Sequence, residues 1–599
     1  MMLLLLGLGA LAGADPLAFE SASDAHCKAE LSSDTLSWTG CRDSGQSGAA
    51  VSSSGFSCES AGDALPLRAV PGTALNNLIL NGTFPGIEDP YLDDNLAKLP
   101  DLNVSTTRKS AHDANDSAAP PLTSTAPPLT RRIVLRAAGN FYTLWWRTSF
   151  SIAGDGKSCA GERLWLHLRG INYRARIFLN GEQLELPTEV SGMFQRFSFD
   201  ATKLAKLGGA ENVLAILVKP PDVVGWADQP VPGGAHPGGQ GGDHGMAQMG
   251  PVMQYTEGWD WAVGVADRNT GPWDKIEMER SADIVIRHPH VATTSVTTNA
   301  SAAGGEGAVV TASATLVNAG KESVTGELSF HFKSYDVHAQ PVTKTVTIPG
   351  GGSIDVSLPA VAATRAALWW PQPLGHPHLH PVRLEFALSK EIVAAHELNI
   401  GLRTVEGIIE PSSGGRSFLI NGLPIFLAGG NWIGTDQLLR YSTDATRYYS
   451  EVRMHKDMGM NLIRVWGGGL TERPEFYEAA DQLGVLVMQE FWMTGDNNGR
   501  WAGDNDWPLD HSLYLSCAAD VMKMLRNHPS LLFWCGGNEL LPGTVGGHGK
   551  NAGARNRTAS GWQGDLIENK LPTLVRQLDG HRFYIPSSMG VYSCVPPPL

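Results

Sequence analysis

The chain has 599 residues, of which 42% are hydrophobic and 18% are charged, so it is not a disordered acidic protein. Lys and Arg total 46 against 60 for Asp and Glu, and the formal net charge of -14 argues against binding to nucleic acid or to an anionic membrane surface. This length suggests about three or four domains, and the 68 glycines suggest many loops and turns between them.

An apolar segment at the N-terminus is typical of a secretory signal. Leu3 to Leu11 has the length of the hydrophobic region of a signal peptide, and Ala12-Gly13-Ala14 has the small-x-small pattern of a cleavage site. No later stretch approaches the roughly 18 uninterrupted apolar residues of a membrane span. Five Asn-x-Ser/Thr sequons support the same route: Asn81, Asn103, Asn115, Asn299 and Asn556. We therefore expect a signal peptide over 1–14, no membrane anchor after its removal, and an extracellular or vacuolar/lysosome-like location.

The seven cysteines are too few for a disulfide framework in a chain of this length. Cys27, Cys41 and Cys58 cluster in an N-terminal segment over 15–63 and could supply one bridge. Cys517 and Cys535 fall on a predicted helix and a predicted strand, where we expect buried thiols. No Cys has a His at zinc-ligand spacing, so we expect neither a metal nor another cofactor.

Short strands separated by turns predict a first β-sandwich over 64–280, of the jelly-roll-like type. Arg174 to Leu179 alternates apolar and polar residues and ends in an Asn180-Gly181 turn, which is typical of a hairpin. The segment 101–132 breaks this pattern, because it is rich in Ser, Thr, Ala and Pro and lacks aromatic residues. We expect it to be a disordered surface insertion.

A second β-sandwich, of the immunoglobulin-like type, is predicted over 281–402 from strand-like segments with Gly or polar separators. His376, His378 and His380 recur within it with a period of two, so they would share one face of a strand and could bind a metal. No carboxylate lies beside them, however, and a His-rich strand edge explains the pattern as well.

From about residue 403 the pattern changes to alternating strands and helices, which predicts a parallel sheet covered by helices. The expected strands are Ile425–Ala428, Asn461–Trp466, Val485–Phe491, Leu531–Trp534 and Arg582–Pro586. We expect one helix to be capped by Thr471, to carry Pro474 in its first turn and to end at Gly484. The natural candidate is the N-terminal part of a (β/α)8 barrel over 403–599.

Active sites of such barrels lie at the C-terminal ends of the strands. The residues predicted at those ends are Asn431, Trp432, Arg464, Trp466, Glu490, Trp492, Asn538 and Glu539. Carboxylates and amides can hold sugar hydroxyls, while indole rings stack on the apolar faces of sugars. The Gly467-Gly468-Gly469 run has no Lys beside it for phosphate binding, and a Gly-x-Ser-x-Gly elbow is absent.

Each of these residues also has a purely structural interpretation. Glu490 could be an ion-pair partner of Arg464 that only fills the mouth of the barrel. Glu539 could be a solvated loop carboxylate, and Trp466 and Trp492 could be core aromatics.

Several motifs resemble glycoside hydrolase family 2. Arg526-Asn527-His528-Pro529-Ser530, a hydrophobic strand and then Gly537-Asn538-Glu539 is similar to the acid/base signature of that family. Further motifs are similar to its mannose-directed branch and to the plant-type mannosylglycoprotein endo-β-mannosidases: Gly429-Gly430-Asn431-Trp432 with Asp436, Ile463 to Gly469, Gln489 to Asp496, and Glu257-Gly258-Trp259-Asp260-Trp261.

The resemblance implies a retaining hydrolase of the Man-β-1,4-GlcNAc bond in N-glycan cores, with a mannose-containing oligosaccharide as its partner. It implies Glu539 as the general acid/base, Asn538 as the ligand of the 2-hydroxyl, and Asp260, beside Trp259, as a ligand of the same sugar. Trp432 and Trp466 would stack on the sugar or form a wall of the site.

The resemblance also implies a second carboxylate, the nucleophile, on the seventh strand of the barrel. The chain ends at Leu599 near the predicted fifth strand, well short of a typical barrel of about 250 residues. We therefore expect the nucleophile to lie beyond the end of this chain, which would be an incomplete version of the glycosidase. Two alternatives stay open: an exo-acting β-mannosidase of the same family, and an inactive, glycan-binding product.

Overall fold

The fold is taken from a computed structural model. It describes residues 15–23, 26–58, 64–87, 89, 95, 99–100, 102, 141–153, 161–223, 246–259, 261–262, 264–298, 305–412, 414–440, 445–494, 508–540 and 565–588. The predicted signal segment and nearly all of the predicted insertion over 101–132 lie outside these residues. Leu102, the described residue of that insertion, is buried and donates its N–H to the carbonyl of Ala266 at 3.1 Å.

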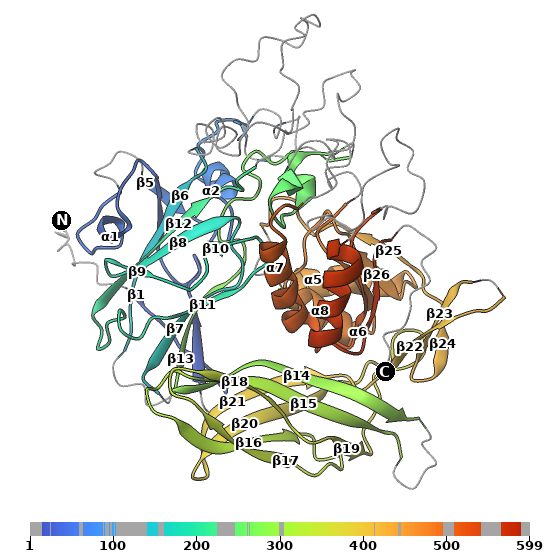
Figure 1. The fold of residues 1–599 in the computed structure, drawn as a ribbon. Coiled ribbons are helices and arrows are strands. Elements are labelled where there is room, and N and C mark those ends of the chain that lie inside the picture. The colour runs from blue at the N-terminus through green and yellow to red at the C-terminus, as the bar shows by residue number, and fades with distance from the viewer. Residues whose placement is uncertain are drawn as a thin grey trace, which may run out of the picture.

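Two sheets packed face to face form the first domain (Figure 1). The larger sheet has the order β10-β8-β12-β6-β4-β5, with β1 beside β6 and β9 beside β8. Its strands are β1 (Asp15–Pro16), β4 (Trp38–Arg42), β5 (Ala64–Leu67), β6 (Leu144–Ser151), β8 (Arg174–Leu179), β9 (Glu182–Leu184), β10 (Val190–Ser191) and β12 (Glu211–Lys219). The other sheet has the order β11-β7-β13-β3-β2, from β2 (Glu20–Ser23), β3 (His26–Glu30), β7 (Arg163–Leu168), β11 (Phe197–Asp200) and β13 (Ile276–Ser281). Short helices accompany the sheets: α1 (Gly48–Val51), α2 (Ala74–Leu80), η2 (Met246–Gln248) and η3 (Gln254–Glu257).

The first sandwich begins earlier than the predicted boundary at residue 64. Strand β3 pairs with β13, and β4 lies between β5 and β6, so the Cys-containing segment supplies strands to both sheets. Cys41 and Cys58 form a disulfide within this domain, and Cys27 is also disulfide-bonded. The expectation of a bridge in this segment is therefore confirmed, while the segment itself is part of the sandwich.

The hairpin predicted at Asn180-Gly181 is present. Leu179 pairs with Glu182, and both turn residues have positive φ angles, 54° for Asn180 and 93° for Gly181. Asn and Gly tolerate this conformation, which matches the twist of the flanking strands.

The second sandwich has two four-stranded sheets, and Figure 1 shows it beneath the first sandwich and the helices of the third domain. One sheet contains β14 (Ile284–Thr297), β15 (Gly307–Asn318), β18 (Ser353–Ser357) and β19 (Val361–Thr364). The other has the order β17-β16-β20-β21, from β16 (Val324–Phe332), β17 (Val342–Ile348), β20 (His380–Leu388) and β21 (Glu391–Ile400).

The three-histidine pattern leads into β20, which lies between β16 and β21 in its sheet. Only His380 lies in a strand, and its buried ring bonds the carbonyl of Ala367 at 2.8 Å. Among the residues that the structure describes, no three His, Cys, Asp or Glu side chains are grouped so that they could hold a metal ion. His376 and His378 lie in the segment that precedes β20 and do not share a strand face with His380.

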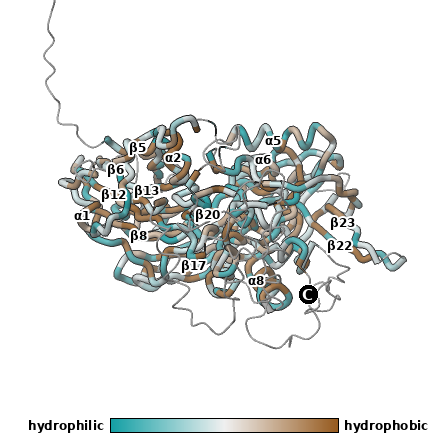
Figure 2. Tube along the Cα trace, turned by 90° about the horizontal axis from the view of Figure 1, so that it is seen from above, coloured by the Kyte–Doolittle hydropathy of each residue, from teal (hydrophilic) through white to brown (hydrophobic). Residues whose placement is uncertain are grey.

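A small antiparallel sheet leads into the third domain. It comprises β22 (Val405–Ile409), β23 (Arg416–Ile420) and β24 (Leu423–Ile425), and the β22–β23 hairpin extends away from the body in Figures 1 and 2. The predicted strand at Ile425–Ala428 is therefore wrong, because the first parallel strand begins at Gly429.

The third domain has a five-stranded parallel sheet in the order β25-β26-β27-β28-β29, as the strand–helix alternation predicted. Its strands are β25 (Gly429–Trp432), β26 (Leu462–Val465), β27 (Leu486–Glu490), β28 (Leu531–Cys535) and β29 (Phe583–Ile585). Its helices are α5 (Ala445–Asp457), α6 (Pro474–Leu483), α7 (His511–Leu525), the π-helical η4 (Asp565–Lys570) and α8 (Leu571–Leu578).

Helix α6 ends as predicted but begins differently. Gly484 terminates it with a φ of 72°, whereas its N-cap is Arg473 and not Thr471. The Thr471 hydroxyl instead accepts a hydrogen bond from Trp492 Nε1 at 2.8 Å. The predicted cap was wrong because this hydroxyl serves a tertiary contact.

The first sandwich and the third domain share one apolar core. Met193, Phe194 and Trp273 of the sandwich pack with Trp492 and Tyr514 of the third domain. This shared core fixes the loops of the sandwich against the ends of the parallel strands. No helix within the described ranges is long and apolar enough to cross a bilayer.

Candidate active site

A polar cluster occupies the C-terminal ends of the first four parallel strands, and its Glu490 and Asn538 members are buried. Arg464 of β26 reaches Glu490 of β27, Asn431 of β25 and Asn538, which follows β28. Its Nη2 atom lies 2.8 Å from Glu490 Oε1 and 2.6 Å from Asn538 Oδ1, and its Nη1 lies 3.0 Å from Asn431 Oδ1. One guanidinium thus links the end of its own strand to the ends of three others, which its rigid array of donors allows.

Glu490 is the most deeply buried member of this cluster and hydrogen-bonds to two of its neighbours. Its side chain has no solvent exposure, and its two oxygens accept hydrogen bonds from Arg464 and from the N–H of Gly467 at 2.8 Å. Burial raises the pKa of Glu490, although Arg464 and Gly467 favour the ionised form. The ion pair with Arg464 that the structural interpretation of Glu490 expected is present.

Glu539 lies on the exposed side of the same cluster, after a tightly turned segment. Gly537 and Glu539 have φ angles of 158° and 50°, and the Glu539 N–H donates to the Ser588 hydroxyl at 3.0 Å. Asn538 is fixed between them by its N–H, which donates to the carbonyl of Met493 at 2.9 Å. A non-glycine residue in the left-handed region is uncommon and is often found at functional sites. This turn leaves the Glu539 side chain exposed beside the polar cluster.

Aromatic rings from two domains border the cluster. Trp466 follows β26, and its ring contacts Trp259 of the first sandwich edge-to-face, with centroids 5.3 Å apart. The N–H of Tyr255 donates to the carbonyl of Gly468 at 3.1 Å and links the two loops. Trp259 and Trp466, which were predicted separately as substrate-binding residues, therefore lie in contact.

Trp432 does not join them. Its ring packs on Phe476 of α6 and His455 of α5, and its Nε1 donates to Glu472 at 2.8 Å. Asn431 points toward Arg464, and neighbouring residues of a strand face opposite sides, so Trp432 faces the helices. The expectation that it forms a wall of the site was wrong.

Trp492 and Asp436 also serve structural contacts. Trp492 is buried and stacks on Phe194 of the first sandwich, with centroids 4.3 Å apart and an interplanar angle of 4°. The Asp436 carboxylate is buried and pairs with Arg440 at 2.9 Å. Asp260 lies outside the described residues.

A buried chain of hydrogen bonds behind the cluster, the Glu472–Tyr448–Arg473 relay, could not be anticipated from the strand ends. Glu472 accepts hydrogen bonds from Trp432 and Tyr448, and Tyr448 in turn accepts one from Arg473 at 2.8 Å. Arg473 also donates to the carbonyl of Trp273 in the first sandwich at 2.6 Å. The charged pair Glu472-Arg473 directly before a helix was the available signal in the sequence.

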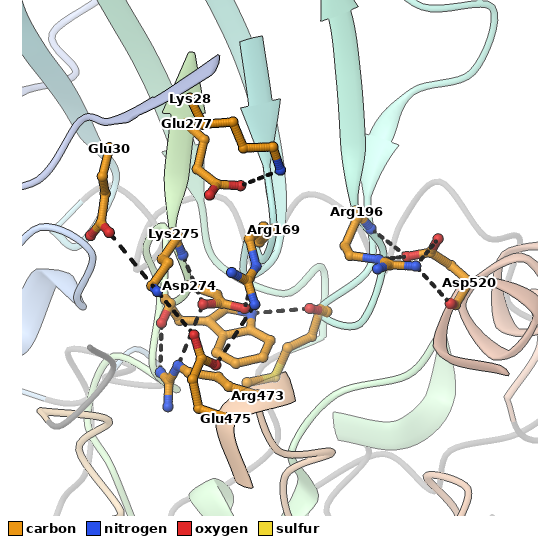
Figure 3. A network of polar contacts seen from close by, with 12 residues as sticks. Lys28, Glu30, Arg169, Arg196, Asp274, Lys275, Glu277, Arg473, Glu475 and Asp520 are labelled. Carbon is orange, nitrogen blue, oxygen red and sulfur yellow. Dashed lines mark hydrogen bonds and ion pairs between the residues drawn. The ribbon is translucent and has the colours of Figure 1, made fainter. Parts of the chain in front are cut away.

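Figure 3 shows how charged residues join the first sandwich to α6 around this relay. Asp274 lies 3.6 Å from Arg473 and 3.7 Å from Arg169, and Lys275 lies 2.9 Å from Glu475. A separate pair, Arg196 with Asp520, connects the sandwich to α7. These contacts fix the loop between β26 and α6, which carries Trp466.

The motif that resembles the acid/base signature begins at Arg526, at the opposite end of β28. Its first residues contact the second sandwich. Arg526 Nη2 donates to the carbonyl of His288 at 2.6 Å, and Asn527 accepts the N–H of Val291 at 2.9 Å. His528 bonds Asp481 at 2.6 Å. Only the Asn538-Glu539 end of the motif therefore reaches the candidate site.

Two β-sandwiches are followed by a parallel α/β domain, and a different model of one family matches each of the three domains. Three models of that family match in order: its galactose-binding domain-like model over 137–274, the glycosyl hydrolases family 2 model over 289–403, and its TIM barrel domain over 414–558. The chain belongs to glycosyl hydrolase family 2.

Curated relatives within the family include mannosidases. The chain is 39% identical over 420 residues to mannosylglycoprotein endo-beta-mannosidase of Lilium longiflorum, covering 67% of this chain and 40% of that protein. It is 32% identical over 291 residues to beta-mannosidase B of Aspergillus fumigatus, covering 48% of this chain and 31% of that protein. The chain thus spans less than half the length of these relatives.

Solved structures agree on the fold. The exo-chitosanase CsxA of Amycolatopsis orientalis matches with a TM-score of 0.65 at 20% identity, over 92% of this chain and 52% of that one. The beta-D-mannosidase of Dictyoglomus thermophilum matches with a TM-score of 0.64 at 22% identity, over 94% and 57%.

Proposed function

We propose that this chain carries the acid/base part of a retaining glycosidase that cleaves the Man-β-1,4-GlcNAc bond of N-glycan cores. The observation that carries the proposal is the Asn538-Glu539 turn, which lies at the C-terminal end of β28 beside the Arg464–Glu490 pair. The similarity to the lily endo-beta-mannosidase supports the choice of substrate.

In this proposal Glu539 protonates the leaving oxygen and later deprotonates the attacking water. Its exposed side chain supports direct contact with substrate. A retaining mechanism needs a second carboxyl group at about 5–5.5 Å. Glu490 is a poor nucleophile, because its carboxylate is wholly engaged by Arg464 and Gly467. We therefore assign the nucleophile to a residue outside the described part of the chain.

Asn538 is the proposed ligand of the sugar 2-hydroxyl. Arg464 has only donors, so the oxygen of the Asn538 amide must face it. The amide nitrogen makes no hydrogen bond within the described residues and is available to donate to a hydroxyl. Asn431 is oriented by the same guanidinium and supports a second contact of this kind.

The proposed location is the secretory pathway, with an extracellular or vacuolar/lysosome-like destination. The Cys41–Cys58 disulfide supports it, because such bonds persist mainly in oxidising compartments. An N-glycan substrate is found in the same compartments.

The test is hydrolysis of a mannose-ended N-glycan core oligosaccharide by the protein in a form that includes the nucleophile, with the products separated by size. We expect release of an intact mannose-ended oligosaccharide, and loss of this activity in Glu539→Gln. Glu568→Gln, which changes an exposed carboxylate on η4, is the matched control and should keep the activity.

Other outcomes would replace the proposal. Release of single mannose only would favour an exo-acting β-mannosidase. Glycan binding without turnover, unchanged in Glu539→Gln, would favour a glycan-binding protein.

A further inference from the structure

Trp261 differs from the other tryptophans around the candidate site because its side chain is exposed. It is 52% exposed, whereas Trp259 and Trp466 are each 6% exposed. Single exposed apolar side chains are common on protein surfaces, so exposure alone indicates nothing. The ring contacts and the position of Trp261 distinguish it.

Three aromatic rings hold the Trp261 indole in place. Tyr255 is stacked against it, with centroids 6.0 Å apart and an interplanar angle of 24°. Trp466 meets it edge-to-face at 5.6 Å, and Trp259 lies at 6.3 Å. These neighbours already restrict the indole ring. Binding of a ligand to its exposed face would therefore cost little side-chain entropy.

This aromatic group is continuous with the polar cluster. Trp466 lies two residues beyond Arg464 on the same chain segment, and the next N–H, that of Gly467, donates to Glu490. The exposed indole therefore lies at the outer edge of a surface whose inner part presents amide and carboxylate groups. Polar groups that hold hydroxyls, next to an accessible ring, suit a ligand with more than one sugar unit.

We propose that Trp261 is a binding platform for a second sugar ring, next to the sugar held by the Asn538 and Arg464 cluster. This proposal rests on the proposed function and adds to it a preference for oligosaccharides over single sugars. The pyranose C–H face packs on the indole, while the polar cluster holds the hydroxyls of the neighbouring sugar. Trp261 is a specificity-determining residue in this arrangement and takes no part in proton transfer.

The experiment measures binding by calorimetry in the full chain carrying Glu539→Gln, so that the glycan stays intact. The probes are a mannose-ended N-glycan core oligosaccharide and methyl β-mannoside. We expect Trp261→Ala to weaken oligosaccharide binding about three- to tenfold and to leave methyl β-mannoside binding unchanged. Trp261→Phe should retain most of the oligosaccharide affinity, because it keeps an aromatic face.

Tyr335→Ala is the matched control, since Tyr335 is a fully exposed aromatic residue of the second sandwich. It should leave binding of both probes unchanged, and circular dichroism should show the same fold in all variants. Equal oligosaccharide affinity in Trp261→Ala and in the parent Glu539→Gln chain would overturn the proposal that Trp261 binds a second sugar. The proposed function would be unaffected. Equal weakening of both probes would also overturn the proposal for Trp261. A parent that binds neither probe would overturn the platform and the proposed function together.

Discussion

Arg464 donates two hydrogen bonds to one oxygen of Glu490, from Nε at 2.9 Å and from Nη2 at 2.8 Å. This double contact fixes the plane of the guanidinium, so that its Nη atoms point to Asn431 and Asn538. Glu490 is therefore a positioning residue, which acts on the proposed sugar ligands through Arg464.

The first prediction concerns Glu490→Gln. An amide can accept from Arg464 or from the Gly467 N–H but not from both, and it leaves the guanidinium charge unpaired. We expect the free energy of unfolding to fall by about 3 kcal/mol, measured by urea denaturation, and glycan binding to weaken.

The matched control for this variant is Glu397→Gln. Glu397 pairs with Lys333 and Arg383 but has a side chain that is 35% exposed, so its loss should cost less than about 1 kcal/mol. Equal losses in the two variants would show that the buried pair has no special role.

The sequence predicted which strand ends form the candidate site. It did not predict which side chains at those ends face the site. Asn431 and Trp432 are neighbours on β25, so a strict alternation rule excludes that both point into the cleft. Trp466 and Trp492 follow the ends of their strands, where alternation no longer applies. Their different directions depend on Trp259 and Phe194, which the first sandwich contributes from distant parts of the sequence.

Contacts between residues far apart in the sequence also explain why the predicted start of the first sandwich, at residue 64, was too late. Strand β4 pairs with β6, about one hundred residues later, and no local pattern indicates such a partner. Local signals succeeded where the structure is local, as at the Asn180-Gly181 turn and at the Gly484 end of α6.

The second prediction concerns the Cys41–Cys58 disulfide, which closes a loop with a sequence separation of 17. Both sulfurs lie in a small apolar cluster with Trp145 and Phe178. Replacing both cysteines by Ser should lower the free energy of unfolding by about 3 kcal/mol, because the unfolded chain gains conformational freedom. Urea denaturation with and without reductant measures this loss, and the reductant should destabilise the variant less than the wild type, because the variant keeps only the disulfide of Cys27. Equal sensitivity to reductant in the wild type and the variant would contradict the prediction.

The third prediction concerns acid stability at the contact between the second sandwich and α7. Burial, aided by the Arg526 guanidinium, lowers the pKa of His290 from 6.5 to about 3. Asp579, Arg582 and His581 also influence this ring. As the pH falls below 6.5, the unfolded chain binds a proton at this His and the folded chain does not. Stability is therefore present above pH 6.5 and is lost toward pH 3, by up to about 1.4 kcal/mol per pH unit.

His290→Asn removes this titration, so the variant should lose less stability than the wild type between pH 7 and pH 4.5. Urea denaturation at a series of pH values measures the difference between the two proteins. A difference that does not change with pH would show that His290 does not contribute to acid sensitivity.

The last prediction concerns Arg473, which joins the first sandwich to the relay behind the active-site cluster (Figure 3). Its side chain is buried, and its removal leaves the Asp274 carboxylate and the Tyr448 hydroxyl without this partner. We expect Arg473→Met to lower the free energy of unfolding by about 3 kcal/mol, because the buried Asp274 carboxylate loses one of two counter-ions and keeps only Arg169.

The control is Arg453→Met on the outer face of α5, where the ion pair with Asp457 is exposed on both sides. It should change the free energy of unfolding by less than about 0.5 kcal/mol. Because Arg473 anchors the loop that carries Trp466, its loss should also weaken glycan binding, whereas a purely local stability effect would leave that binding intact in the folded fraction. Unchanged stability in Arg473→Met would show that the two domains are held by their shared apolar core alone.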